Sequence, residues 1–264
     1  MRQQTPDPAR RAPQGLAALM ARQPRLTAGI LALSVLGWLF LAWIAFDMSQ
    51  PFAQLTMPDS PHWSASSVLA IWTMWALMMA AMMLPSALPM ILTFVDLGVR
   101  SGDPVRGHSF VAAYLLVWFA FSVAATGAQW ALQALGWIDP MIVSSSALLT
   151  GLLLLIAGVY QFSRLKKVCL SRCRTPMGFL LGEWRAGVHG AFVMGVRHGL
   201  FCVGCCWALM ALLFVGGAMN LAWVAALSIA VAIEKLAPGG ERLASVLGLG
   251  LMAAGLVRLL ALLR

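Results

Sequence analysis

The sequence predicts an all-α integral membrane protein, a bundle of about seven transmembrane helices with a cytoplasmic N-terminus and its C-terminus outside. Of the 264 residues, 61% are apolar and only 10% are charged, whereas soluble domains carry about a quarter charged residues. Several apolar runs reach the roughly 20 residues that a helix needs to cross a bilayer. The lipid bilayer is therefore the expected surrounding of most of the chain.

The apolar runs define the predicted helices, and the Pro, Gly and charged residues between the runs define their limits. We expect helices at residues 26–46, 67–95, 109–136, 145–164, 187–214, 218–237 and 243–262.

The connections between these helices differ in charge. Segments 1–25, 96–108, 165–186 and 238–242 contain most of the Lys and Arg residues, and the connections on the opposite side contain none. Basic connections stay on the cytoplasmic side of a membrane, which fixes the predicted orientation. We therefore interpret the net charge of +9 as a topology signal. No nucleic-acid partner is expected, and the predicted location is a bacterial inner membrane.

The chain divides into two predicted parts. Residues 1–25 form a basic cytoplasmic tail, which we expect to be disordered because its beginning is rich in Pro, Gln and Arg. Residues 26–264 form a single transmembrane helical domain. The first apolar run is too long for the apolar core of a typical signal peptide, so we expect it to be a retained helix.

The segment HGLFCVGCCW places a histidine and three cysteines in the fifth predicted helix. At about 100° per residue, Cys202 and Cys205 lie within roughly 40° of His198, and Cys206 lies about 80° from it. Met194 falls near −40° on the same scale, about one turn before the histidine. One face of this helix thus carries all these soft donor groups.

Thiolate, imidazole and thioether groups are the ligands of soft metals, and here they favour Cu(I) first and zinc second. Two other interpretations stay open. Cysteine also packs as a small apolar residue, and Cys202 and Cys205 form a C-x-x-C pair that is capable of thiol redox chemistry. A metal-ligand role is favoured, because ionisable groups inside a membrane are costly and usually functional.

The second predicted helix is rich in methionine, with five methionines within ten residues. Met74, Met78 and Met82 recur every fourth residue on one face, and Met79 and Met83 form a second stripe. Methionine at helical spacing often only fills the core. The density here leads us to expect that Met78 or Met82 completes the metal site.

The predicted cytoplasmic segment LKKVCLSRCRTP contains the two remaining cysteines, Cys169 and Cys173, among Lys and Arg residues. Neighbouring cations favour the thiolate form. This pair is a candidate metal-transfer or redox site, and the alternative is that the cations serve topology and the cysteines are incidental.

The segments WTMWALMMAAMMLPSALPM, AGVYQFSRLKKVCLSRCRTP, HGLFCVGCCWALMALLFVGGAMNLAW and EKLAPGG resemble an uncharacterised family of predicted metal-binding bacterial integral membrane proteins. The resemblance covers roughly residues 65–240 and implies metal binding without a named metal or reaction. The positions that match this family are Met82, Met83, Pro85, Cys169, Cys173, His198, Cys202, Cys205, Cys206 and Glu234.

The sequence has no Walker loop and no dinucleotide-binding glycine motif, and it has no set of residues suited to hydrolysis, so a non-enzymatic role is favoured. The main hypothesis is Cu(I) handling, either transfer into or across the membrane or delivery to a cuproenzyme, with a metallochaperone or the cuproenzyme as partner. The alternatives are a membrane thiol oxidoreductase and a structural or assembly subunit of a larger membrane complex.

Overall fold

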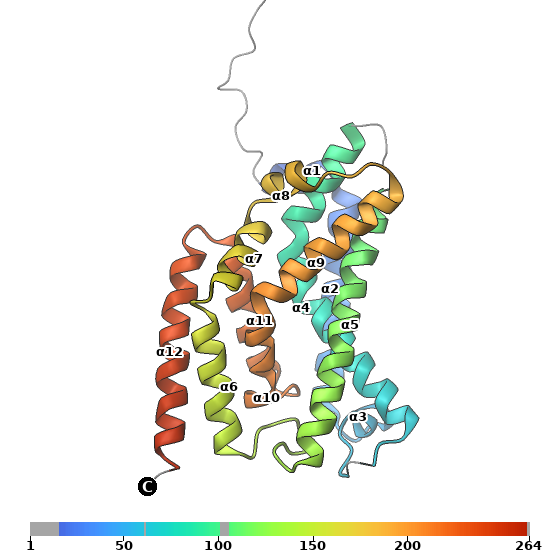
Figure 1. Ribbon diagram of the computed structural model, residues 1–264. Coiled ribbons are helices and arrows are strands. Elements are labelled where there is room, and N and C mark those ends of the chain that lie inside the picture. Colours follow the sequence, from blue (N-terminus) through green and yellow to red (C-terminus); the bar gives the residue numbers. More distant parts are fainter. Residues whose placement is uncertain (1–15, 61, 101–105, 263–264) are drawn as a thin grey trace, which may run out of the picture.

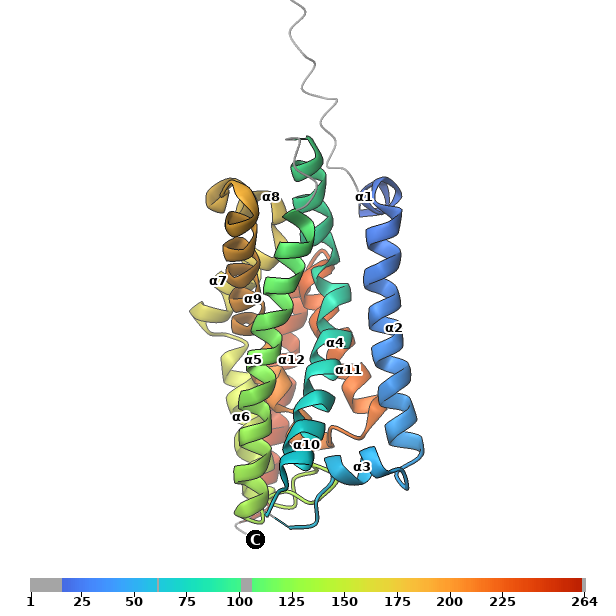
Figure 2. The ribbon, with the colours of Figure 1, turned by 90° about the vertical axis from the view of Figure 1, so that its right-hand side faces the viewer.

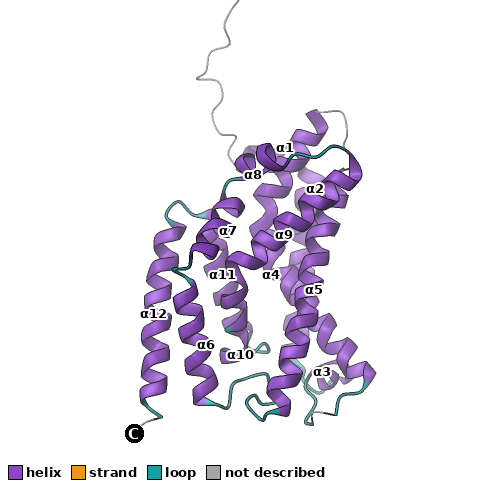
Figure 3. Ribbon diagram, viewed as in Figure 1, coloured by secondary structure: helices purple, strands orange, loops and turns teal. Residues whose placement is uncertain are grey.

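The computed structural model describes residues 16–60, 62–100 and 106–262, and helices make up most of this part of the chain (Figures 1 and 3). Within it, extended backbone pairs only at an isolated bridge between Ile138 and Ser144. The helices are α1 (Leu16–Arg22), α2 (Pro24–Phe46), α3 (Pro51–Thr56), α4 (Ala65–Arg100), α5 (Arg106–Ala134), α6 (Ala147–Tyr160), α7 (Arg164–Arg174), α8 (Pro176–Glu183), α9 (Gly187–Ala211), α10 (Leu213–Gly216), α11 (Leu221–Leu236) and α12 (Gly240–Leu260).

Each predicted range contains a helix, but fewer than seven are long and apolar enough to span a membrane. Among the described residues, α2, α4, α5, α12 and the α9–α10 segment meet this requirement, and the bent pair α6–α7 raises the number from five to six. The remaining predicted helix, α11, has 16 residues, which corresponds to about 24 Å at the usual rise per residue. A bilayer core is about 30 Å thick, so α11 is short for a span.

The fourth predicted helix ends earlier than expected, at Tyr160 instead of residue 164. The chain then turns by 64° into α7. Ser163 starts the new helix, because its hydroxyl accepts the backbone N–H of Lys166 at 3.1 Å, which is the usual role of a serine N-cap. The segment predicted as a cytoplasmic loop, 165–186, therefore contains two helices.

The long helices stand side by side in one bundle (Figures 1 and 2). Helix α4 packs between α2 and α5, α5 packs on α9, and α6 packs on α12. The most apolar stretches of α4 and α9 are 67% and 56% buried, against 28% for α2 and 22% for α12. The inner helices are thus those that carry the methionines and cysteines. Helices α1 and α8 lie at one end of the bundle, and α3 and α10 lie at the other, where α12 also ends (Figure 1).

Two glycines allow α5 and α9 to approach closely. A Cβ atom at Gly195 would overlap the carbonyl oxygen of Phe110, and one at Gly199 would lie 2.8 Å from Cβ of Val117. Small residues four apart commonly permit such contact between membrane helices. This arrangement sets α9 directly against α5.

Helix α4 continues through Pro85 and Pro89. A proline has no N–H group for the carbonyl four residues earlier, so Pro85 leaves the carbonyl of Ala81 without its helical partner. The Ser34 hydroxyl of α2 donates to this oxygen at 2.7 Å. A side chain from a neighbouring helix therefore replaces the lost hydrogen bond beside the methionines.

Part of the tail that was predicted to be disordered is helical. Leu16–Arg22 forms α1, because LAALMAR consists of strong helix formers and Leu19 is buried against the bundle. Residues 1–15, which also belong to that predicted tail, lie outside the described residues.

Candidate functional site

Three cysteines lie on the inner face of α9. Cys202, Cys205 and Cys206 are each about 1% exposed and carry free thiols. The thiols of Cys205 and Cys206 donate to the backbone carbonyl of Cys202 at 3.1 and 3.0 Å. The predicted shared face therefore exists, and Cys202 lies at its centre.

The other two cysteines join this group through α7. Cys173 lies close to Cys202 and Cys205, and Cys169 is buried where a Cβ atom on Gly204 would approach its sulfur to 2.7 Å. The sequence placed both residues in a separate cytoplasmic loop. Instead, the basic segment forms an amphipathic helix whose cysteine side packs on α9, so all five cysteines of the chain gather in one region.

Lys235 of α11 reaches into the same region. Its ammonium nitrogen lies 2.9 Å from the Cys202 sulfur, 3.2 Å from the Ser86 hydroxyl and 3.8 Å from the Met83 sulfur. The residue is only 5% exposed. Sequence reasoning did not select Lys235 as a site residue, although a lysine at the end of an apolar helix is itself a signal, since ionisable groups inside a membrane are usually functional.

Aromatic residues of α5 and α8 complete the walls. The Tyr114 hydroxyl lies 3.1 Å from the Cys202 sulfur and 3.3 Å from the Met83 carbonyl. His198 is buried, with its ring 5.5 Å from that of Tyr114, 5.9 Å from Phe110 and 5.7 Å from Phe179. Its Nδ1 atom is buried without a hydrogen-bond partner in the described part of the chain.

The predicted methionines are all buried, and one further methionine contacts this centre. Met83 is the one whose sulfur approaches Lys235 and hence Cys202. Met78 and Met82 are buried in the apolar core. The sulfur of Met194 accepts the backbone N–H of Arg185 at 3.4 Å. The expectation that Met78 or Met82 completes the metal site stays a prediction, and Met83 is a contact of the centre that sequence reasoning did not select for it.

A buried ion pair holds α11 and α7 together beside the cysteines. The Lys166 ammonium lies 2.7 Å from a Glu234 carboxylate oxygen, and Gln161 donates to the other oxygen at 3.0 Å. Arg174 donates to the backbone carbonyls of Glu234 and Ala237 at the end of α11. These contacts fix the end of α11 from which Lys235 extends.

A model of the copper chaperone family matches residues 72–258. The chain belongs to the copper chaperone family. The matched range includes every cysteine and His198, Lys235 and Met83, but not α2. Comparisons with curated proteins and with solved structures gave no match.

The donor groups of this copper chaperone family member suit its implied cargo. Thiolate and thioether sulfurs are ligands of soft metals, copper among them, and the Nδ1 atom of His198, one helical turn from Cys202, has no hydrogen-bond partner among the described residues. Among the described residues, no group of three or more His, Cys, Asp or Glu side chains has an arrangement that could hold a metal ion. The sulfurs are therefore gathered without forming a closed multi-ligand cage.

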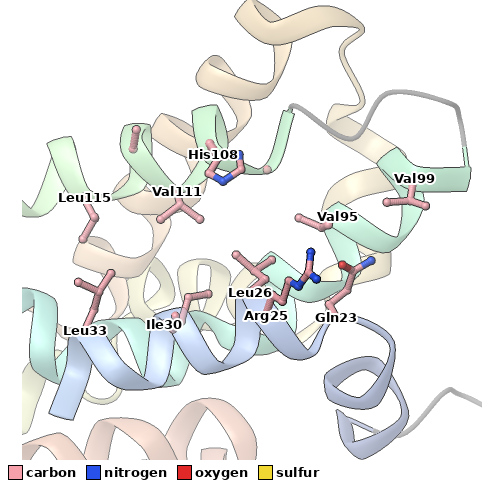
Figure 4. A pocket seen from close by; sticks show the side chains of 13 residues that line it. Gln23, Arg25, Leu26, Ile30, Leu33, Val95, Val99, His108, Val111 and Leu115 are labelled. Atoms are coloured by element: carbon pink, nitrogen blue, oxygen red, sulfur yellow. The ribbon is translucent and has the colours of Figure 1, made fainter.

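A separate groove of about 660 Å³ lies between α2, α4 and α5 (Figure 4). Aliphatic side chains such as Ile30 and Val111 line it, with Arg25 and His108 on its walls. None of its lining residues is a cysteine or methionine. In this copper chaperone family member, the groove and the sulfur cluster are distinct features.

Proposed function

We propose that this protein carries Cu(I) within the membrane at a site centred on Cys202 and passes the ion on, across the membrane or to a cuproenzyme. One observation carries the proposal: all five cysteines, four of them buried, converge near Met83 in a chain from the copper chaperone family. The hydrogen bond from the Lys235 ammonium to the Cys202 sulfur supports its central place.

The surroundings of Cys202 favour transfer over permanent storage. A Cu(I) ion bound by two sulfurs moves when a third sulfur forms a bond to it as one of the first two is released, and no electron is transferred. Cys173, Cys205 and Cys206 are the neighbouring sulfurs of Cys202. Cys173 is partly exposed, whereas the other cysteines are buried. It is therefore the proposed point of entry or exit, with His198 and Met83 as additional donors inside.

The proposed setting is the bilayer itself, in the inner membrane of a bacterium. The five long apolar helices support membrane insertion. In this proposal residues 26–264 act as one transmembrane domain with a cytoplasmic N-terminus. A metallochaperone would supply the ion or a cuproenzyme would receive it.

The direct test is the copper content of the purified protein. The protein is loaded with Cu(I) without oxygen, passed over a desalting column and analysed for metal per chain. We expect close to stoichiometric copper in the native protein and its loss in the double variant C202S/C205S. The variant M48L is the control, since Met48 is an exposed sulfur residue in the connection after α2.

Native protein that retains no copper would overturn the proposal and favour a structural or assembly subunit. The redox alternative is tested by thiol trapping and mass spectrometry. A disulfide between Cys202 and Cys205 in the oxidised protein would favour it. The two residues lie on one intact helix, a geometry in which side chains three apart do not readily form a disulfide.

A further inference from the structure

Lys235 is a buried cation whose polar contacts lack a carboxylate. Among the described residues its ammonium group contacts two sulfurs and one hydroxyl, those of Cys202, Met83 and Ser86. The adjacent acid, Glu234, is already engaged by Lys166 and Gln161 on the other side of α11. Its charge is thus directed at the sulfur cluster.

A buried charge without compensation is costly. A metal bound inside the bundle must therefore leave the site close to electrically neutral. Metal-binding cysteines act as thiolates, and Cys205 and Cys206 both lie against Cys202 on α9, so the proposed site has Cys202 and one neighbouring cysteine as its two ligands. Two thiolates, one monovalent cation and the Lys235 ammonium together have no net charge. With a divalent cation the same groups have a net positive charge.

The softness of the sulfur donors alone does not discriminate between monovalent and divalent ions. Cysteine sulfur also binds Zn(II) well, and divalent Cd(II) is a soft ion. The fixed positive charge 2.9 Å from Cys202 adds a second criterion, the charge of the ion.

We propose that Lys235 is a specificity-determining residue that makes the Cys202 site selective for monovalent soft cations, Cu(I) and Ag(I), over divalent ones. This inference rests on the proposed function and names the residue that excludes competing metals. Lys235 acts without ligating the ion, through the charge that it places beside the ligands.

The first test uses the native protein with two soft ions that differ in charge. Binding of Ag(I) and of Cd(II) is measured by competition against chelators of known affinity for each metal. We expect stoichiometric Ag(I) and no Cd(II) at the same free metal concentration. Equal occupancy by both ions would overturn the selectivity. A native protein that binds neither Cu(I) nor Ag(I) would instead overturn the proposed function.

The second test changes the charge alone. In K235M, which keeps a long unbranched side chain, we expect the ratio of Cu(I) to Zn(II) affinity to fall by roughly ten-fold or more, because a full charge is removed close to the ion. In K235R, which keeps the charge, the ratio should stay within about three-fold of the native value. An unchanged ratio in K235M would overturn the role of Lys235. If K235M does not fold, the comparison of Ag(I) with Cd(II) binding to the native protein still tests the selectivity for monovalent ions.

Discussion

At the scale of single residues, Cys202 differs from the other cysteines in the groups that contact its sulfur. An ammonium, a phenol hydroxyl and neighbouring thiols all approach it. Its position on the helix face is predictable from the sequence, because it depends only on the helical repeat. Its partners are not, because Lys235 and Tyr114 belong to other helices whose rotation depends on packing.

Removal of the Tyr114 hydroxyl should weaken metal binding. In Y114F the Cys202 sulfur loses a hydrogen bond of 3.1 Å. Hydrogen bonds to charged groups contribute about 1.5–3 kcal/mol, so we expect Cu(I) affinity to fall by roughly ten-fold, as measured by chelator competition. Y160F is the matched control, since the Tyr160 hydroxyl donates to a backbone carbonyl, that of Gly204. A loss of the same size in both variants would contradict a specific role for Tyr114.

At the scale of helices, α7 is the element that the sequence obscures most. RLKKVCLSRCR has the composition of a cytoplasmic connection, and only the serine before it marks a helix start. What makes it part of the core is the pairing of Lys166 with Glu234, residues that lie far apart in the sequence. The same pairing explains why Glu234 and Lys235, adjacent in the chain, contact different partners.

Loss of the Lys166 ammonium should destabilise the protein. Both members of its ion pair are 2% exposed, and breaking a buried pair on one side costs about 3–5 kcal/mol. We expect K166M to lower the unfolding midpoint of the purified protein in detergent. The double variant K166M/E234L should recover much of the loss, because no unpaired charge remains. A double variant no more stable than K166M would contradict this explanation.

Close packing of α5 on α9 gives a prediction with an internal control. G195A introduces a methyl group against the Phe110 carbonyl, and overpacking of this kind typically costs about 1–3 kcal/mol. G127A makes the same change on α5 at a position with nothing within 4 Å. Thermal unfolding should show a lower midpoint for G195A and an unchanged or higher one for G127A. Equal effects would show that the glycines do not set the distance between these helices.

At the scale of the whole molecule, the positions of the predicted helices are confirmed but not the predicted number of spans. Hydropathy locates α2, α4, α5 and α12 well, since each is a continuous apolar run. It does not detect the 64° turn after α6, because the residues at the turn have no strong helix-breaking character. Hydropathy also counts α11 as a membrane span, because this apolar helix has the composition of a span, although its 16 residues are too few to cross the bilayer core easily.

The predicted orientation follows from the charge pattern and from the ends of the bundle. Helix α1 and the end of α12 lie at opposite ends (Figure 1). We expect a fluorescent protein fused to the N-terminus to fluoresce in the cytoplasm, and alkaline phosphatase fused to the C-terminus to be active outside. Reporter signals from a single side would contradict this orientation.

The hydrogen bond from Ser34 to the Ala81 carbonyl bears on the range of residues that the family model matches. Helix α2 precedes residue 72, where the family match begins, yet its serine compensates for a proline inside the matched part. A chain trimmed to the matched residues would lose the hydroxyl group that replaces the missing helical hydrogen bond, two residues before Met83. The region recognised by similarity thus depends on a helix that precedes it.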